Sequence, residues 1–219
     1  MADLKRNILL SPGPITTSLN VKNAQLVPDI CPREKEFSNL MCSVNQDLIK
    51  IISGDQRKYC NIMFSGSGTA SVEAVLSSAI PFDSAVLILI NGAYGLRMKK
   101  ILESHNKKVE VLQFENSTPI NFDTVNKFLS SNKRIRYVTM VHHETTTGVL
   151  NSIEKFSELR KTFGCVLILD AISSFGGIPI NIKETPIHYL ISSSNKCLQG
   201  LPGLSFVICE IKALNKLKN

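Results

Sequence analysis

Residues 61–79 read NIMFSGSGTASVEAVLSSA, which changes from one kind of secondary structure to another within a single turn. The apolar run at 61–64 is short and predicts a buried strand, and the stretch 69–79 predicts a helix. The Gly/Ser-rich turn between them would present backbone N–H groups and hydroxyls at the start of that helix. Strand, tight turn and helix in this order form the basic unit of an α/β fold.

The same alternation continues along the rest of the chain. Most apolar runs are short, rich in β-branched residues and not alternating, which is typical of strands covered on both faces. The predicted strands are residues 61–64, 86–90, 109–114, 137–141, 166–169, 189–191 and 206–208, and the predicted helices are residues 37–51, 69–79, 94–104, 122–129 and 153–163. The first helix would share one apolar face among Phe37, Leu40, Met41, Val44, Leu48 and Ile51. The sequence therefore predicts an α/β fold of three αβα layers around a mainly parallel central sheet, with ligands beyond the carboxyl ends of its strands.

The composition of the 219-residue chain, 43% hydrophobic and 20% charged, is that of a soluble globular protein with one large domain. No apolar run approaches the roughly 18 to 20 residues that a membrane helix needs. The N-terminus also lacks the long apolar stretch of a signal peptide. We therefore expect a cytoplasmic protein with no membrane partner.

The net charge of +7 raises the alternative of a nucleic-acid-binding module. Basic residues are spread along the chain, however, and aromatic residues make up only 6% of it, without alternating with the basic ones. No nucleic-acid-binding motif is present either. We expect no nucleic-acid partner, and a small anionic substrate would suit the same charge.

The cysteines and histidines do not form a metal-binding pattern. The six cysteines lie at positions 31, 42, 60, 165, 197 and 209, without a CxxC pair, and their spacing is typical of reduced thiols in a core. His142 and His143 are adjacent, so on a strand they would point to opposite faces, which favours hydrogen bonding over shared metal ligation. We expect no metal site and no disulfide framework.

Three further stretches place chemically useful side chains directly after predicted strands. Asp170 follows the strand at 166–169, as a cap or as a functional carboxylate. Tyr94 follows the strand at 86–90 within INGAYGLR, where an ordinary core or capping role would also explain it. Three threonines follow in MVHHETTTG. The turn of SGSGT lacks the spacing of a nucleotide-binding loop, and alone a tight turn with a helix cap explains it equally well.

Lys196 is the most unusual residue, because the apolar run YLISSS leads directly to it. Lysines are rarely fully buried unless their charge is compensated. A phosphate cradle, an aromatic face, hydroxyls, an acid and a lysine at different strand ends together suit one ligand, pyridoxal 5′-phosphate (PLP). Its aldehyde would take the lysine amine as a Schiff base, which removes the free ammonium charge.

The chain resembles the class V aminotransferases of the aspartate-aminotransferase fold (fold type I). The matching stretches run in the family's order from Leu9 to about Cys209. They are LLSPGPITTS, CPREKEF, SGSGTASVEA, NGAYGLR, HHETTTGVLN, LDAISSFGGIPI and SSSNKCLQGLPGLSFV. No single stretch is decisive, but together they cover nearly the whole chain.

The resemblance implies a role for each matching residue. Lys196 would be the catalytic Schiff-base lysine, and Asp170 would hold the proton on the ring nitrogen. The remaining cofactor-binding residues would be Ser67, Gly68 and Thr69 at the phosphate, together with Ser193 or Asn195, Tyr94 stacked on the ring and Thr146 at its polar edge. Pro14, Thr16 and Thr17, from the stretch PGPITTS, would approach the substrate.

The resemblance is strongest to the branch that acts on 2-aminoethylphosphonate. It implies transfer of the amino group from 2-aminoethylphosphonate to pyruvate, giving phosphonoacetaldehyde and alanine. Two alternatives stay open: another class V enzyme of the alanine–glyoxylate or serine–pyruvate type, and a PLP-binding remnant without catalysis. The family also implies a homodimer in which the partner subunit contacts the cofactor phosphate.

The domain organisation follows the same resemblance. Residues 1–30 would form an N-terminal segment at the active-site entrance, and residues 31–219 would form the PLP-binding large domain. Family members continue into a C-terminal small domain that supplies an arginine for the substrate acid, and we expect that domain to be missing here. His143 and Ser194 depart mildly from the family pattern, which favours smaller residues at both positions.

Overall fold

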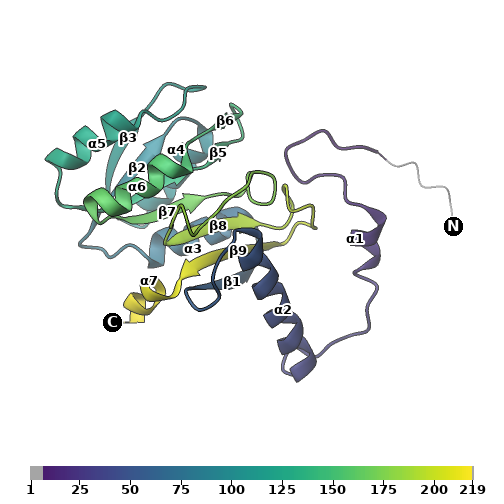
Figure 1. The fold of residues 1–219 in the computed structure, drawn as a ribbon. Helices are drawn as coiled ribbons and strands as arrows, with labels where there is room; N and C mark the ends of the chain where they lie inside the picture. The colour runs from purple at the N-terminus through teal and green to yellow at the C-terminus, as the bar shows by residue number, and fades with distance from the viewer. Residues whose placement is uncertain (1–6, 219) are drawn as a thin grey trace.

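Seven strands form one sheet in the order β1-β9-β8-β7-β4-β2-β3 (Figure 1). The structure is a computed structural model, and it describes residues 7–218. The strands of the sheet are β1 (Tyr59–Ser65), β2 (Ala85–Ile90), β3 (Lys108–Gln113), β4 (Ile135–Val141), β7 (Val166–Asp170), β8 (Tyr189–Ser193) and β9 (Leu204–Glu210). Two further strands, β5 (His143–Glu144) and β6 (Val149–Leu150), form a separate hairpin.

The sheet is mainly parallel, as the sequence predicts. β2 pairs parallel with β3 and β4, and the parallel pairing continues from β4 to β7 and from β7 to β8. β9 runs antiparallel to both β8 and β1. Six of the seven strands of this sheet therefore point their carboxyl ends toward the same edge.

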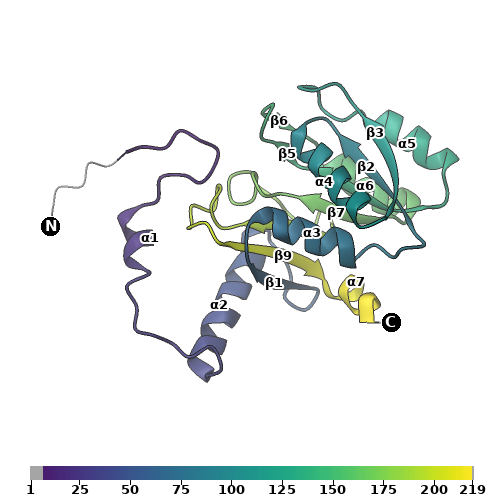
Figure 2. The same ribbon diagram turned by 180° about the vertical axis from the view of Figure 1, so that it is seen from behind.

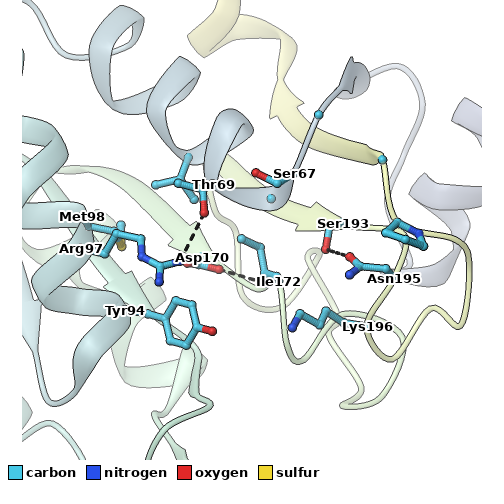
Figure 3. A pocket seen from close by; sticks show the side chains of 15 residues that line it. Ser67, Thr69, Tyr94, Arg97, Met98, Asp170, Ile172, Ser193, Asn195 and Lys196 are labelled. Atoms are coloured by element: carbon cyan, nitrogen blue, oxygen red, sulfur yellow. Dashed lines mark hydrogen bonds between the residues drawn. The ribbon is translucent and has the colours of Figure 1, made fainter. Parts of the chain in front are cut away.

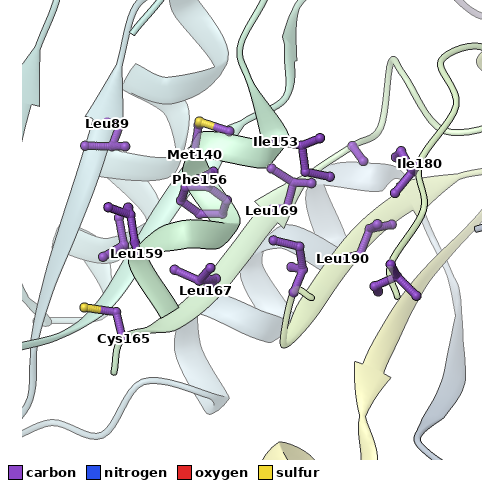
Figure 4. Packing of buried hydrophobic residues seen from close by; sticks show 14 of the residues in the cluster. Leu89, Met140, Ile153, Phe156, Leu159, Cys165, Leu167, Leu169, Ile180 and Leu190 are labelled. Carbon is purple, nitrogen blue, oxygen red and sulfur yellow. The ribbon is translucent and has the colours of Figure 1, made fainter. Parts of the chain in front are cut away.

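Helices cover both faces of the sheet and complete the three layers (Figures 1 and 2). One face carries α2 (Lys35–Ile51), α5 (Phe122–Ser131) and α6 (Ile153–Phe163), and the other carries α3 (Gly68–Ser78), α4 (Ala93–Ser104) and α7 (Ile211–Asn215). The α2, α5 and α6 side of the sheet has one hydrophobic core, the first core, and the α3, α4 and α7 side has another, the second core. Alternate residues of β2 point to opposite sides, since Leu87 packs in the first core and Val86 in the second. Figure 4 shows the first core, where Phe156 of α6 packs beside Leu167 and Leu169 of β7.

The predicted strands and long helices are confirmed within a few residues at each end. The sequence did not predict α1 (Leu19–Asn23), the β5–β6 hairpin, α7 or the 3₁₀ helix at Lys216–Lys218. All of these are too short to show a hydrophobic period. The hairpin matters for function, because its turn carries Thr146.

The predicted apolar face of α2 is only partly correct. Leu48 is buried, but Leu40 and Ile51 are half exposed, while Ile49 and Ile52 are buried instead. The helix contacts the sheet at β1 near its own C-terminal end and projects away from the sheet at its N-terminal end (Figure 1). Burial therefore follows the tilt of the helix and not its hydrophobic stripe alone.

The prediction of core thiols is also wrong in part. All six cysteines are free, but only Cys165 and Cys209 are buried, while Cys31, Cys42 and Cys197 are exposed. The exposed three lie outside the strands and the two hydrophobic cores. Within residues 7–218 no helix has the length and apolar character needed to cross a bilayer. The division into a segment at 1–30 and a domain at 31–219 stays a prediction, and residues 1–6 of that segment lie outside the described residues.

Candidate active site

A cavity of about 340 Å³ lies where β1, β7 and β8 end and where α3 and α4 begin (Figure 3). Its walls come from five separate parts of the chain. The lining residues are Gly66, Ser67, Gly68, Thr69, Val72, Tyr94, Arg97, Met98, Asp170, Ile172, Ser193, Asn195, Lys196, Pro202 and Gly203. Of the predicted cofactor-binding residues, Thr146 is the one outside this lining.

The N-terminus of α3 forms one wall of the cavity. Ser67 is the N-cap residue, and no side chain caps this helix, so its first backbone N–H groups are available to an anion. A Cβ on Gly68 would come within 2.6 Å of Ile172 Cδ1, which explains the glycine at this close approach. Arg97 adds a positive charge here, since its Nη1 donates to Thr69 Oγ1 over 3.4 Å.

Asp170 ends β7 and is almost fully buried at 5% exposure. Its Oδ1 accepts a hydrogen bond of 2.9 Å from the backbone N–H of Ile172. Burial raises the pKa of the Asp170 carboxyl from 3.8 to about 6, with the Glu144 charge adding to the rise and the Ile172 N–H and Arg97 opposing it. An ionised carboxyl is costly in this place, and a cationic N–H group next to it would relieve that cost.

Lys196 lies in the loop after β8 and extends across the cavity toward Tyr94 (Figure 3). It is half-buried, and its Nζ donates to the carbonyl oxygen of Gly13 over 2.9 Å. Burial lowers the pKa of the Lys196 amine. Ser194 holds this loop, since its hydroxyl donates to the Leu204 carbonyl over 3.0 Å. Lys196 is therefore neither a solvated surface charge nor a core residue.

Tyr94 and Arg97 come from the first two turns of α4. The Arg97 guanidinium lies 4.8 Å from the centre of the Tyr94 ring, which is a cation–π contact. Thr146, in the turn of the hairpin, is exposed, and its hydroxyl donates to Glu144 Oε1 over 2.8 Å. Ser193 Oγ donates to Asn195 Oδ1 over 3.0 Å at the opposite wall.

The N-terminal segment contacts Lys196 through Gly13, which is not one of the three residues predicted to approach the substrate. Pro14, Thr16 and Thr17 do not line the cavity, and Thr16 Oγ1 accepts instead from the backbone N–H of Leu9 over 2.6 Å. Gly13 makes the contact, through the carbonyl that accepts from Lys196. Gly13 has a φ of +149°, and a Cβ there would lie 2.2 Å from Lys196 Cδ, so the close approach needs glycine.

Two histidines near the site have the hydrogen-bonding roles that the sequence favours. His142 Nδ1 lies 2.9 Å from Ser174 Oγ, and His143 Nδ1 lies 3.0 Å from Ser173 Oγ. Burial lowers the pKa of His142 to about 4, so its ring is neutral at neutral pH. Gly13, Arg97 and Glu144 lie within the matching stretches, but no pattern in the sequence assigns a role to them.

The lining fits the cofactor that the sequence predicts. An anion site at a helix N-terminus, a ring surface, a buried carboxyl and a partly desolvated amine surround one cavity. Ser67, Gly68 and Thr69 would hold a phosphate, Tyr94 would face an aromatic ring, and Asp170 would accept from a ring N–H. Lys196 carries the lining's one primary amine, the group that an aldehyde needs.

The raised pKa of Asp170 predicts a pH-dependent stability of the cofactor-free chain. Between about pH 4 and pH 6 the native state holds more protons than the unfolded state, so this carboxyl costs increasing stability as pH rises through that window. Asp170→Asn keeps an acceptor for the Ile172 N–H and should be more stable than wild type above pH 7, by up to about 3 kcal/mol, with the advantage vanishing near pH 4. Urea unfolding of both chains across this range measures the difference. A wild-type chain that gains on the Asn variant as pH rises would contradict the assigned environment.

Comparison with known proteins identifies the fold and the family of relatives. The model of the family "Aminotransferase class-V" matches residues 19–219. A 2-aminoethylphosphonate–pyruvate transaminase from Bacillus cereus is 42% identical over 211 residues, covering 96% of this chain and 61% of that protein. A bifunctional phosphonoacetaldehyde hydrolase/aminoethylphosphonate transaminase from Clostridioides difficile is 41% identical and is covered over 33% of its length. The chain thus spans less than two thirds of the curated relatives it matches.

Solved structures agree with the sequence relatives. An alanine–glyoxylate aminotransferase from Nostoc sp. superposes with a TM-score of 0.91 at 26% identity, over 100% of this chain and 58% of that one. A pyridoxamine–pyruvate aminotransferase from Mesorhizobium loti gives a TM-score of 0.90 at 25% identity, over 97% of this chain and 53% of that one. The three-layer fold with its mainly parallel sheet is therefore that of the PLP-dependent aminotransferases.

Proposed function

Because this chain belongs to the class V aminotransferases, whose cofactor is PLP, we propose that it carries the cofactor-binding half of an enzyme that transfers the amino group of 2-aminoethylphosphonate to pyruvate. The products would be phosphonoacetaldehyde and alanine. The observation that carries the proposal is the placement of Lys196, Asp170, Tyr94 and the α3 N-terminus around one cavity. The names of relatives at 41–43% identity support the choice of amino donor.

Bound in this cavity, PLP supplies an aldehyde that combines with amines and a ring that withdraws electrons from the substrate carbon. Lys196 is the residue that moves the proton. Burial lowers the pKa of its amine, so more of it is neutral near neutral pH, as a base or nucleophile requires. The Gly13 carbonyl accepts from Nζ over 2.9 Å and so fixes the position of the amine in the cofactor-free chain.

The other lining residues would bind the cofactor and hold it in one orientation. Asp170 is buried at the end of a rigid central strand, where its carboxyl can hold a proton-bearing ring nitrogen in a fixed place. The N–H groups at the start of α3 and the hydroxyls of Ser67 and Thr69 bind a phosphate. Arg97 links two of the lining residues, since it contacts Thr69 and the Tyr94 ring.

Visible absorbance of the purified chain tests the proposal. With PLP, wild type should show an absorption band that Lys196→Ala lacks, and 2-aminoethylphosphonate should shift that band. Alanine and serine serve as comparison amines. A shift with serine or alanine and none with 2-aminoethylphosphonate would overturn the donor and favour another class V activity. A lysine-dependent band that no amine shifts would indicate a PLP-binding protein without catalysis.

We also propose that two copies of the chain associate. The segment before α2 exposes large apolar side chains, among them Leu10, Leu19 and Leu26, and it lies apart from the sheet (Figures 1 and 2). Such surfaces are usually covered by a partner. Light scattering should give twice the chain mass of 24.2 kDa, and the double substitution Leu19→Glu and Leu26→Glu should reduce it to one copy. A wild-type monomer at all concentrations would contradict association.

A further inference from the structure

We propose that Glu144 is a positioning residue that fixes Tyr94, in the cavity lining, and the neighbouring Thr146 in one arrangement at the cofactor site. The proposal deepens the proposed function and rests on it. Tyr94 belongs to α4 and Thr146 to the turn between β5 and β6, two segments far apart in the sequence. Glu144 is the side chain that contacts both.

The carboxylate of Glu144 accepts hydrogen bonds from both segments. Oε2 accepts from the backbone N–H of Tyr94 over 3.2 Å and from that of Gly95 over 3.4 Å. Oε1 accepts from the Thr146 hydroxyl over 2.8 Å and from the Thr146 backbone N–H over 3.5 Å. The Tyr94 N–H also lies 3.4 Å from Oε1, so the carboxylate as a whole bridges the start of α4 and the turn of the hairpin.

Glu144 is rigidly held where it does this. Its side chain is fully buried at 0% exposure, and its backbone carbonyl accepts from Gly148 N over 2.8 Å. The α4 helix leaves room for the carboxyl only because residue 92 is a glycine. A Cβ on Gly92 would lie 2.1 Å from Glu144 Cγ and 2.4 Å from Cδ. The missing side chain at Gly92 thus leaves the space that the Glu144 side chain fills.

The arrangement has a consequence for the site. Gly92 is the N-cap of α4 and gives that helix no side-chain cap, so Glu144 supplies the acceptor from another segment. A negative group at a helix N-terminus is favourable, which fixes the first turn and with it Tyr94. The Thr146 hydroxyl donates to Oε1 and accepts from the backbone N–H of Ala93 over 3.5 Å, and these two contacts fix its direction. A shift of either segment would move the other.

Glu144→Gln is the sharpest test, because it preserves size and removes one acceptor. Four donors converge on two oxygens, and the amide nitrogen of Gln cannot accept from any of them. We expect the Kd for PLP and the Kd for pyridoxal, which lacks the phosphate, to rise by the same factor of about ten. The visible circular dichroism of the bound cofactor should also change, since it reports the fixed orientation of the ring. A purely structural role would lower thermal stability and leave this signal unaltered.

Two matched variants complete the test. Glu154→Gln removes the charge of an exposed glutamate in the first turn of α6, away from the cavity, and should leave both Kd values and the circular dichroism unchanged. Thr146→Val removes the hydroxyl and with it the contacts to Glu144 Oε1 and the Ala93 N–H, at an exposed position where the chain should fold normally. It should change the circular dichroism in the same direction as Glu144→Gln, with a smaller rise in Kd.

The outcomes separate this proposal from the function on which it rests. Wild type that binds neither PLP nor pyridoxal would overturn the proposed function. Wild type that binds both, with Glu144→Gln matching it in Kd and circular dichroism, would overturn the role of Glu144 alone. If Glu144→Gln does not fold, Thr146→Val decides: values identical to wild type would overturn the proposal, and an altered circular dichroism would support it.

Discussion

Lys196→Ala is expected to abolish transamination and the visible absorption band of the chain with PLP. In the proposed mechanism the lost amine both bonds to the cofactor and moves the proton, and acid–base catalysis alone is worth about 10²–10⁴-fold. The side chain makes one hydrogen bond, to Gly13, and is only half-buried, so the fold should remain intact. Turnover and absorbance measured on the same preparation, with thermal unfolding, separate chemistry from folding.

Lys183→Ala is the matched control for that substitution. Lys183 is exposed in the loop before β8 and does not line the cavity, so its loss should leave turnover and absorbance unchanged. Full turnover by Lys196→Ala would contradict the assignment of the catalytic amine. An equal loss in both variants would point to a general effect of charge.

Asp170→Ala is expected to leave some PLP binding but little turnover. The N-terminus of α3 and the Tyr94 ring remain, while the carboxyl proposed to hold a proton on the ring nitrogen is gone. Removing one preorganised electrostatic contact of this kind costs about 10²–10³ in rate. The Kd for PLP and the rate of transamination measure the two effects separately.

Asp170→Asn tests the role of Asp170 further, because this one substitution is predicted to raise the stability of the chain and to lower its turnover. Above pH 7 the cofactor-free Asn variant should be the more stable chain, since it lacks a buried carboxyl whose pKa is raised to about 6. Its turnover should nevertheless be as low as that of Asp170→Ala. Retained transamination in either variant would contradict the role of Asp170.

The sequence was sufficient for the fold because its strands are buried on both faces. Runs such as the one at 86–90 have no polar alternation, so they indicate a parallel sheet between two helical layers. The sequence did not predict the buried face of α2 correctly, because Leu40 lies on the predicted apolar face but is half exposed. A helix pattern shows which residues could be buried together, whereas the tilt of the helix against β1 decides which of them are.

The sequence could predict the position of those site residues that directly follow a strand of the parallel sheet. Asp170, Tyr94 and Lys196 come together because β7, β2 and β8 run in the same direction. Strand direction does not predict which side chains of two different loops will contact each other. Nothing in NGAYGLR or HHETTTG alone indicates that Glu144 enters the space above Gly92, since that depends on the three-dimensional path of two loops.

Identification of the lysine that bonds to PLP tests the central claim most directly. The wild-type chain would be incubated with PLP, reduced with borohydride to make the bond permanent, digested, and its peptides weighed by mass spectrometry. We predict one pyridoxyl group per chain, on the peptide that contains Lys196. Labelling spread over other lysines, or absent from Lys196, would show that the cavity at the strand ends does not bind the cofactor in the way described.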